Sequence, residues 1–444
     1  MILPARALEH ITERIRALNL ARRRGGKEAA AASLLALFYV AVVLRQGRRP
    51  DIVCRRNGHN VRVLRALAAI IDRPYYPSWL TPNGHVNCLL GFAKIGPRMA
   101  RTREHVQTWD GGYFAMDWRN RDPTEPDLKP DAPALLAIHG LNGSSDEACI
   151  LYTMENAHKR GWRAVAMNHR GCGGTRYTSG FGYSGAFTGD VRLAVSHIRN
   201  RYPDAPIFAV GYSLGANLLV KYLGEEGAKG YRPLAGAVSV SNPWNFENNT
   251  VGGGMSKGLF GTVMGKIYSW ALTVGIKMAM KEHLDNEFLR RRPELDLKSC
   301  MRVGSLPEYD GSVIVPMWGY RDIEDYYRDA SSDRYVLNVR CPLLCINAKD
   351  DPICQANLFP VDAARRNPFI IFVTTAAGGH IGFGEGFNPW GRQSWADRLI
   401  AQYFAAVLAE RAGLDSRKDT PPGDESSAGQ SGVRGTRPHA SARL

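Results

Sequence analysis

Two serines stand in the pattern Gly-x-Ser-x-Gly, which can present a nucleophilic hydroxyl at a sharp turn between a strand and a helix. The first is Ser213, which lies between the apolar run 207–210 and the helix-forming run 216–221. Its flanking glycines leave room where neighbouring segments come too close for a Cβ atom. The second is Ser256, which follows a glycine-rich segment typical of a flexible loop. We expect Ser213 to be the nucleophile, with a plain helix N-cap as its alternative, and Ser256 to match by chance.

A glycine-containing loop, His139-Gly-Leu-Asn-Gly143, directly follows the apolar run 134–138. A loop of this kind after a sheet strand can direct a backbone N–H group at a developing oxyanion. The expected donors are the amides of Leu141 and of Leu214, the residue after the nucleophile. An ordinary turn is the alternative. His139 itself is a weaker candidate for the catalytic base, because it precedes the nucleophile in the chain.

An acid and a base follow later apolar runs. Asp350 and Asp351 come after the run 343–347, where the orienting carboxylate of a catalytic triad belongs, and Asp351 is favoured over Asp350. His380 lies in a glycine loop after the run 370–374 and is the expected base. The order Ser213, Asp351, His380 is that of α/β hydrolases. It predicts acyl transfer through a covalent serine ester.

The elements that must position these residues are short, continuously apolar runs separated by helical stretches. Such runs are typical of strands buried on both faces of a parallel sheet. Two earlier runs bracket a Gly-Gly turn and predict an antiparallel hairpin at residues 106–118. The fold class is therefore α/β, an α/β-hydrolase fold with a mostly parallel sheet, an antiparallel start and helices on both faces.

The chain divides into five expected parts and one insertion. Residues 101–412 form the hydrolase domain, and residues 242–340, where the strand rhythm stops, form an inserted lid that contributes to the substrate pocket, or else a packed cap without lipid contact. The other parts are a basic amphipathic segment at 1–28, a transmembrane anchor at 29–44, an irregular proline-containing lead-in at 51–100 and a disordered polar tail at 415–444.

The anchor prediction rests on an apolar run between basic residues. Residues 29–44 contain no charged side chain, and this stretch is shorter than the roughly 20 residues of a usual span. Flanking arginines can reach outward and extend it. A buried helix and a processed targeting segment are the alternatives. The localisation expected is therefore a membrane, with the endoplasmic reticulum as one candidate organelle.

Composition excludes several classes of protein. A 44% hydrophobic and 22% charged content is ordinary for a globular chain and excludes a mostly disordered protein, a collagen and a multi-span transporter. The net charge is +15, but residues 1–65 carry 14 Lys or Arg against four Asp or Glu. Because the excess surrounds the apolar run, no nucleic-acid partner is expected. Eight scattered cysteines contain no Cys-x-x-Cys pair, so we expect no metal, no cofactor and no disulfide framework.

The chain also carries a set of short motifs between about residues 70 and 410. They are Pro82-Asn-Gly-His85, Asp110-Gly-Gly, Asp117-Trp118, His139-Gly-Leu, Asn168-His-Arg-Gly171, Gly211-Tyr-Ser-Leu-Gly-Ala-Asn217, Asp350-Asp-Pro352 and Gly378-Gly-His-Ile-Gly-Phe383. With them the chain resembles the membrane-anchored α/β-hydrolase-domain lipases, the group that contains the mammalian ABHD members one, two, three and fifteen with bacterial and yeast relatives.

This resemblance implies a single N-terminal anchor and hydrolysis of acylglycerols or phospholipids, so the expected partners are a lipid ester and a membrane. Some members transfer acyl groups to alcohols, and acyl transfer or ester synthesis is the first alternative. A non-catalytic ligand-binding protein on the same fold is the second. Two positions depart from the family pattern: Gly84-His-Val-Asn-Cys88 replaces Gly-His-Leu-Gln-Thr, and Glu385 stands where a His-x4-Asp box would place aspartate.

Overall fold

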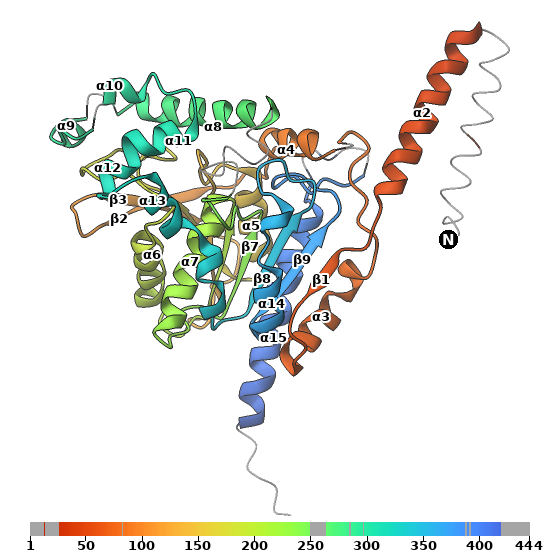
Figure 1. Ribbon diagram of the computed structural model, residues 1–444. Coiled ribbons are helices and arrows are strands. Elements are labelled where there is room, and N and C mark those ends of the chain that lie inside the picture. The colour runs from red at the N-terminus through yellow and green to blue at the C-terminus, as the bar shows by residue number, and fades with distance from the viewer. Residues whose placement is uncertain are drawn as a thin grey trace, which may run out of the picture.

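A nine-stranded sheet runs through the middle of the protein, with the strand order β1-β9-β8-β7-β6-β4-β5-β3-β2 (Figure 1). The computed structural model describes residue 13, residues 26–81, 83–248, 263–283, 286–295 and 297–386, residue 389 and residues 392–418, and the strand order applies to these parts. Neighbours from β4 to β9 pair in parallel, whereas β1, β2 and β3 pair antiparallel. The predicted mostly parallel sheet with an antiparallel start is confirmed.

The strands coincide with the apolar runs because a strand covered on both faces must be apolar along its whole length. Every residue of β4, β6, β7, β8 and β9 is buried. The bounds are β1 Asp51–Val53, β2 Arg101–Gln107, β3 Tyr113–Arg119, β4 Ala134–Ile138, β5 Arg163–Asn168, β6 Ile207–Tyr212, β7 Gly236–Val240, β8 Leu343–Ala348 and β9 Ile370–Thr375.

Helices cover both faces of the sheet. One face packs against α3 (Gly58–Ile71), α5 (Ala148–His158) and α15 (Trp395–Lys418). The opposite face packs against α6 (Gly189–Arg201), α7 (Leu214–Ala228) and α14 (Val361–Arg366). Two separate apolar cores result, one on each side of the sheet.

The lead-in at residues 51–100 is more regular than its prolines predicted. It contains β1, α3 and α4 (Gly84–Ala93), and the sequence analysis missed all three. Asn57 and Asn83 cap the two helices, each accepting a hydrogen bond from a backbone N–H group of the first turn. β1 pairs with β9 at the far end of the chain, and α3 packs on α15. The lead-in therefore completes one edge of the sheet.

The N-terminal helix α2 (Gly26–Gln46) covers the run for which a transmembrane anchor was predicted at residues 29–44. It projects away from the sheet, with Leu34, Leu35 and Phe38 exposed (Figure 1). Among the described residues, no helix has the length and apolar character needed to cross a membrane. The exposure of Leu34, Leu35 and Phe38 contradicts the alternative of a buried helix for these side chains.

Three other sequence predictions fall wholly or largely outside the described residues. Ser256 lies in the segment 249–262, and the amphipathic segment at 1–28 is described only at residue 13 and from residue 26 onward. Of the polar tail predicted from residue 415, residues 415–418 continue helix α15 and residues 419–444 are not described.

The insertion between β7 and β8 forms a helical layer over the carboxyl ends of the parallel strands (Figure 1). Its longest helix is α8 (Val263–Lys281), which lies beside α4: His85 Nδ1 of α4 is 2.9 Å from the Tyr268 hydroxyl. The other described elements are α9 Glu287–Arg290, α10 Leu297–Cys300, α11 Leu306–Tyr309, a π-helical turn Asp310–Ile314, α12 Val315–Trp318, α13 Ile323–Ala330 and two 3₁₀ turns, Ser332–Arg334 and Val336–Asn338.

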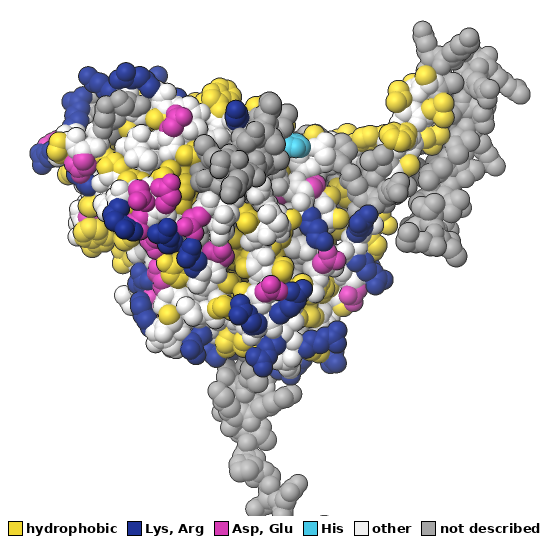
Figure 2. Space-filling view, viewed as in Figure 1, with side chains coloured by type: hydrophobic (Ala, Val, Ile, Leu, Met, Phe, Trp, Pro, Cys, Tyr) yellow, Lys and Arg dark blue, Asp and Glu magenta, His cyan; other side chains and the backbone are white. Residues whose placement is uncertain are grey.

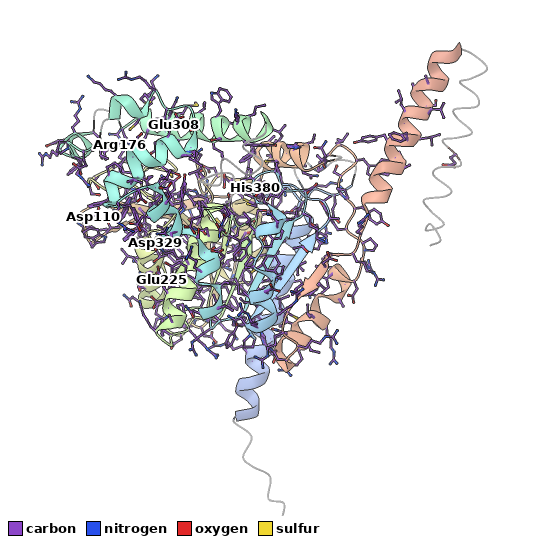
Figure 3. All side chains as sticks on the ribbon, viewed as in Figure 1. Asp110, Arg176, Glu225, Glu308, Asp329 and His380 are labelled. Carbon is purple, nitrogen blue, oxygen red and sulfur yellow. The ribbon has the colours of Figure 1, made fainter. Side chains whose placement is uncertain are left out.

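A buried guanidinium group ties the antiparallel hairpin to the parallel part of the fold. Arg170 follows β5 and is 1% exposed. Its Nη1 donates to Asp110 Oδ2 in the β2–β3 turn at 2.7 Å, and its Nε and Nη2 donate to both carboxylate oxygens of Asp190 on α6 at 2.7 Å. Asp110 is labelled in Figure 3. The network explains why the motifs around Asp110 and Arg170 occur together.

We expect Arg170→Ala to lower the free energy of unfolding by about 3–5 kcal/mol, because removing one partner leaves two carboxylates buried without their counter-charge. The matched control is Arg365→Ala, which breaks the exposed pair with Asp362 on α14 and should change stability by no more than about 1 kcal/mol. Urea denaturation followed by circular dichroism measures both. Equal effects of the two substitutions would contradict the structural role of Arg170.

Candidate active site

Ser213 sits at a strained turn between β6 and α7. Its backbone angles are φ 52° and ψ −120°, a positive-φ conformation that non-glycine residues rarely adopt. The turn is surrounded by backbone: a Cβ atom on Gly215 would lie 2.4 Å from the carbonyl oxygen of His139, and one on Gly211 would lie 2.4 Å from that of Gly215. The two glycines are therefore required by close approach, as the sequence pattern predicted. The strained turn holds the hydroxyl at the end of the strand.

The structure brings the hydroxyl of Ser213 to the imidazole of His380, with Oγ and Nε2 2.8 Å apart. The other ring nitrogen, Nδ1, lies 2.9 Å from Asp351 Oδ2. When Nδ1–H donates to the carboxylate, the lone pair of Nε2 is free to accept the serine proton. His380 lies at the carboxyl ends of the strands, beneath the helical layer (Figure 3).

The geometry separates the two candidate acids. Asp351 accepts hydrogen bonds from His380 and, through Oδ1, from the backbone N–H groups of Ile353 at 2.8 Å and Cys354 at 2.9 Å. Asp350 instead accepts from the N–H group of Gly379 at 2.9 Å, and burial raises its pKa to about 6. Asp350 thus joins the acid loop to the base loop without touching the imidazole.

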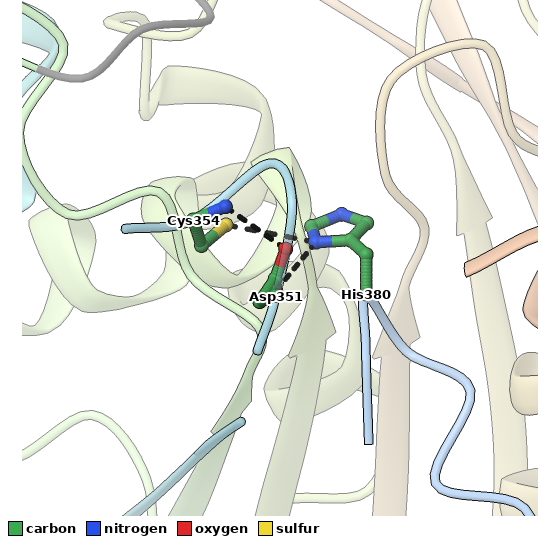
Figure 4. Close-up of side chains that lie close together, drawn as sticks. All are labelled: Asp351, Cys354 and His380. Carbon is green, nitrogen blue, oxygen red and sulfur yellow. Dashed lines mark hydrogen bonds and ion pairs between the residues drawn. The ribbon is translucent and has the colours of Figure 1, made fainter. Parts of the chain in front are cut away.

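Two residues that contact the base or its loop had no sequence motif to mark them. Cys354 Sγ lies 3.6 Å from His380 Nδ1 (Figure 4). The same sulfur lies 3.2 Å from the Ser241 carbonyl oxygen. Ser241 Oγ accepts from the N–H group of Ile381 at 3.1 Å. Asp351, Cys354 and His380 are the group of described residues near enough to share a metal ion. Here, however, Asp351 and His380 are hydrogen-bonded to each other.

The loop after β4 lies against the nucleophile. A Cβ atom on Gly140 would be 3.0 Å from the Cβ of Ser213, and Asn142 has a positive φ of 61°. Leu141 and Leu214 line the cavity that contains Ser213 and His380. Neither of their amides donates to another group in the described part of the chain. Two N–H groups are therefore available near the serine, where the sequence analysis placed the oxyanion donors.

His139 has a different environment from His380. It is fully buried, its Nδ1 donates to the carbonyl oxygen of Gly140 at 2.7 Å, and its Nε2 accepts from the N–H group of His169 at 3.2 Å. Burial lowers the pKa of His139 to about 4. These contacts hold the loop in its shape. Because both ring nitrogens of His139 are engaged in them, neither is free to accept the proton of Ser213.

The cavity beside Ser213 is mostly apolar, and the insertion supplies much of its wall. A second cavity adjoins it, and the two share Leu141, Leu214, Asp310 and Tyr326. The insertion residues of the first cavity are Pro243, Phe246, Leu272, Leu306, Asp310 and Tyr326. Burial raises the pKa of Asp310 to about 7, and its Oδ2 accepts from the Tyr327 hydroxyl at 2.9 Å.

The lead-in helix α4 supports the acid and base loops from behind. A Cβ atom on Gly84 would lie 1.8 Å from the Asp350 carbonyl oxygen, and one on Gly379 would lie 2.4 Å from that of Gly84. Farther along α4, a Cβ atom on Gly91 would be 3.0 Å from the His380 carbonyl oxygen. Gly84, the glycine of this motif, is therefore part of the support of the site.

The described non-glycine residues with positive φ all lie in loops that leave the carboxyl ends of β4, β6, β7 and β9. They are Asn142, Ser213, Ser241, Trp244, Ile381 and Phe383. Backbone strain concentrated in this way is typical of functional sites, where the surrounding structure holds it in place.

Comparisons with known proteins agree with this geometry. Residues 133–387 match the family described as alpha/beta hydrolase fold. The chain is 31% identical to the mouse protein named phospholipase ABHD3, over 84% of this chain and 87% of that one. It is 32% identical to a Saccharomyces cerevisiae monoacylglycerol lipase over 67% of this chain and 66% of that one. It is 31% identical to a medium-chain fatty acid ethyl ester synthase/esterase of the same yeast over 62% of each chain.

A fluorophosphonate probe reacts covalently with activated serine hydroxyls and tests the site directly. We expect wild type and Ser256→Ala to be labelled and Ser213→Ala to stay unlabelled. Asp351→Asn should slow labelling by about 10³- to 10⁴-fold, because the histidine loses the partner that orients its acceptor nitrogen toward the serine. Asp350→Asn, which keeps that partner, should slow it by no more than about tenfold. Normal labelling of Asp351→Asn would contradict the assignment.

Proposed function

Because the chain belongs to the α/β-hydrolase family, we propose that it cleaves carboxylic esters of lipids with Ser213, His380 and Asp351 as its catalytic triad. The family resemblance predicted from the motifs is confirmed by the match over residues 133–387 and by the relatives named phospholipase ABHD3. The chain is a carboxylic ester hydrolase. The observation that supports the mechanism is the hydrogen-bonded series Ser213–His380–Asp351 in the wall of an apolar cavity.

The first half of the reaction forms an acyl-enzyme. Ser213 Oγ attacks the ester carbonyl carbon while His380 Nε2 accepts its proton. Asp351 stabilises the imidazolium that results. The amides of Leu141 and Leu214 hold the oxyanion, and one donor of this kind is worth about 3–4 kcal/mol of transition-state stabilisation. His380 then gives the proton to the departing alcohol.

The second half returns the enzyme to its starting state. Water takes the place of the alcohol, His380 accepts one of its protons, and the hydroxide formed attacks the acyl carbonyl carbon. Collapse of the second tetrahedral intermediate breaks the bond to Ser213 Oγ, which recovers its proton from His380. The free fatty acid leaves, and no bond in the cycle needs a metal or a cofactor.

The substrate class follows from the cavity and from the relatives. Its wall is built largely from apolar side chains such as Phe92, Leu272 and Leu306, which suit a hydrocarbon chain. The insertion at residues 242–340 thus forms the acyl pocket in this proposal. The relatives are named for phospholipids and monoacylglycerols, which are both lipid esters.

Transfer of the acyl group to an alcohol is a second candidate, favoured by the yeast relative named ester synthase/esterase. The same acyl-enzyme would react with an alcohol in place of water. The position that differs from the His-x4-Asp box, Glu385, forms an ion pair with Arg398. Formation of ethyl esters from added ethanol would support this second activity.

Exposed apolar side chains on α4 and α8 suggest how a lipid reaches the site. Leu89 and Phe92 on α4 and Ile267 and Trp270 on α8 are all exposed, and Phe92 also lines the cavity. Exposed apolar groups at a cavity entrance mark a surface for membranes or partners. Figure 2 shows Lys and Arg side chains gathered over α9 and α10 and hydrophobic ones on α2. We propose that the α4–α8 surface docks on a membrane, with these basic groups facing anionic lipid head groups.

A panel of lipid esters tests the proposed activity. We expect purified protein to release fatty acid from a monoacylglycerol or from a phospholipid, and from the soluble ester p-nitrophenyl butyrate. Ser213→Ala should lower each rate by at least about 10³-fold, since the acyl-enzyme can no longer form. Ser256→Ala should leave the rates unchanged. Cleavage of the soluble ester without any lipid ester would contradict the lipid assignment.

The membrane surface is tested with two matched tryptophan variants. Trp270→Asp should lower hydrolysis of lipid embedded in phosphatidylcholine–phosphatidylserine vesicles by about tenfold, because an aromatic side chain leaving water contributes on the order of 1.5–3 kcal/mol. Hydrolysis of p-nitrophenyl butyrate should not change. Trp109→Asp, at an exposed tryptophan in the β2–β3 turn, should affect neither rate. Equal vesicle rates for the two variants would refute the docking surface.

A further inference from the structure

Glu147 is a buried carboxyl group inside the proposed catalytic cavity that the triad does not use. It follows the oxyanion loop and occupies the N-cap position of helix α5. The cavity wall that contains Ser213 and His380 also contains Glu147. Its place in the wall of the same cavity distinguishes it from acids elsewhere in the fold.

One oxygen of this carboxyl group has no hydrogen-bond partner among the described residues. Its Oε2 is buried without a hydrogen bond, and the side chain makes no capping bond to the first turn of α5. Burial raises the pKa of Glu147 to about 7. A buried polar atom without a partner is rare in folded proteins and costs free energy. Where such an atom lines a cavity, a group of the ligand can supply the missing partner.

The fold makes room for the carboxyl group where it lies. A Cβ atom on Gly143 would come within 2.6 Å of Glu147 Oε1 and 2.7 Å of Oε2. Any residue other than glycine at position 143 would therefore displace the carboxyl group. The second glycine of His139-Gly-Leu-Asn-Gly143 thus has a role separate from that of Gly140, which lies against Ser213.

Asp310 provides the contrast. It is the other carboxyl group of this cavity, and burial raises its pKa to about 7 as well. Asp310, however, accepts a hydrogen bond from Tyr327 within the protein. Of the two cavity acids, Glu147 is the one whose carboxyl group accepts no hydrogen bond from a side chain of the described chain.

We propose that Glu147 accepts a hydrogen bond from a free hydroxyl group in the alcohol portion of the substrate. The acyl chain of a common lipid is hydrocarbon, so a donor near the ester belongs to the alcohol. The enzyme therefore selects esters of polyols that keep an unesterified hydroxyl near the scissile bond. This inference rests on the proposed ester hydrolysis, and Glu147 acts in it as a specificity-determining residue.

The test uses three decanoate esters that differ only in hydroxyl groups: propyl, 3-hydroxypropyl and 2,3-dihydroxypropyl decanoate. For wild type, kcat/KM should be about tenfold or more higher for the best hydroxylated ester than for the propyl ester, as expected for one well-placed hydrogen bond to a carboxyl group. Glu147→Met, of similar length and without an acceptor oxygen, should remove this preference. Glu147→Gln, whose amide oxygen still accepts, should keep most of it.

Asp310→Asn is the matched control, because it changes the cavity acid that already has a partner. Its preference for the hydroxylated ester should equal that of wild type. Melting temperatures identify any variant that fails to fold. If Glu147→Met does not fold, the comparison of Glu147→Gln with wild type on the three esters still tests the inference. The inference is overturned if wild type shows no preference for the hydroxylated esters. It is also overturned if folded Glu147→Met keeps that preference, or if this variant loses activity equally on all three esters. If wild type cleaves none of the esters, the proposed function itself fails.

Discussion

The site depends first on backbone packed against backbone. β4 and β6 are neighbouring parallel strands with Ile138 opposite Gly211, so the loops after them begin at the same level of the sheet. Gly215 then fits against the carbonyl groups of residues 138 and 139, where a Cβ atom would lie within about 2.5 Å of both oxygens. This contact brings the nucleophile and the oxyanion loop together before any side chain is considered.

The acid and the base reach the serine from the next strands along the same edge. Because β8 and β9 are parallel to β6, the loops that carry Asp351 and His380 leave the sheet on the side of Ser213. Helix α4 backs these loops, and its glycines allow the two backbones to touch. Positive φ angles at six non-glycine residues are held within this packing. Strain of this kind persists only where neighbours on all sides constrain it.

Sequence reasoning succeeded where a local pattern has one physical cause. The central strands were predictable because burial on both faces requires an apolar run. Ser213, Asp351 and His380 were singled out because they follow the ends of those runs, and their catalytic roles stay a prediction. It failed where the partner is distant: β1 and α3 are stabilised by β9 and α15, which no local pattern reveals. The sequence did not single out Cys354, Ser241 or Glu147 for the same reason, because only their neighbours in three dimensions distinguish them. The transmembrane anchor at residues 29–44 stays a prediction, made from an apolar run that is shorter than a usual span.

The pairing of β1 with β9 has a consequence for the newly made chain. Residues 51–53 leave the ribosome early, yet the strand they pair with, residues 372–374, is among the last parts of the domain to be made. The apolar residues of α3 likewise have no packing partner until α15 has been made. During synthesis these segments, together with α2, expose apolar groups that chaperones recognise. The carboxylate and imidazole of the site arrive last, so a nascent chain has its serine long before it has a base.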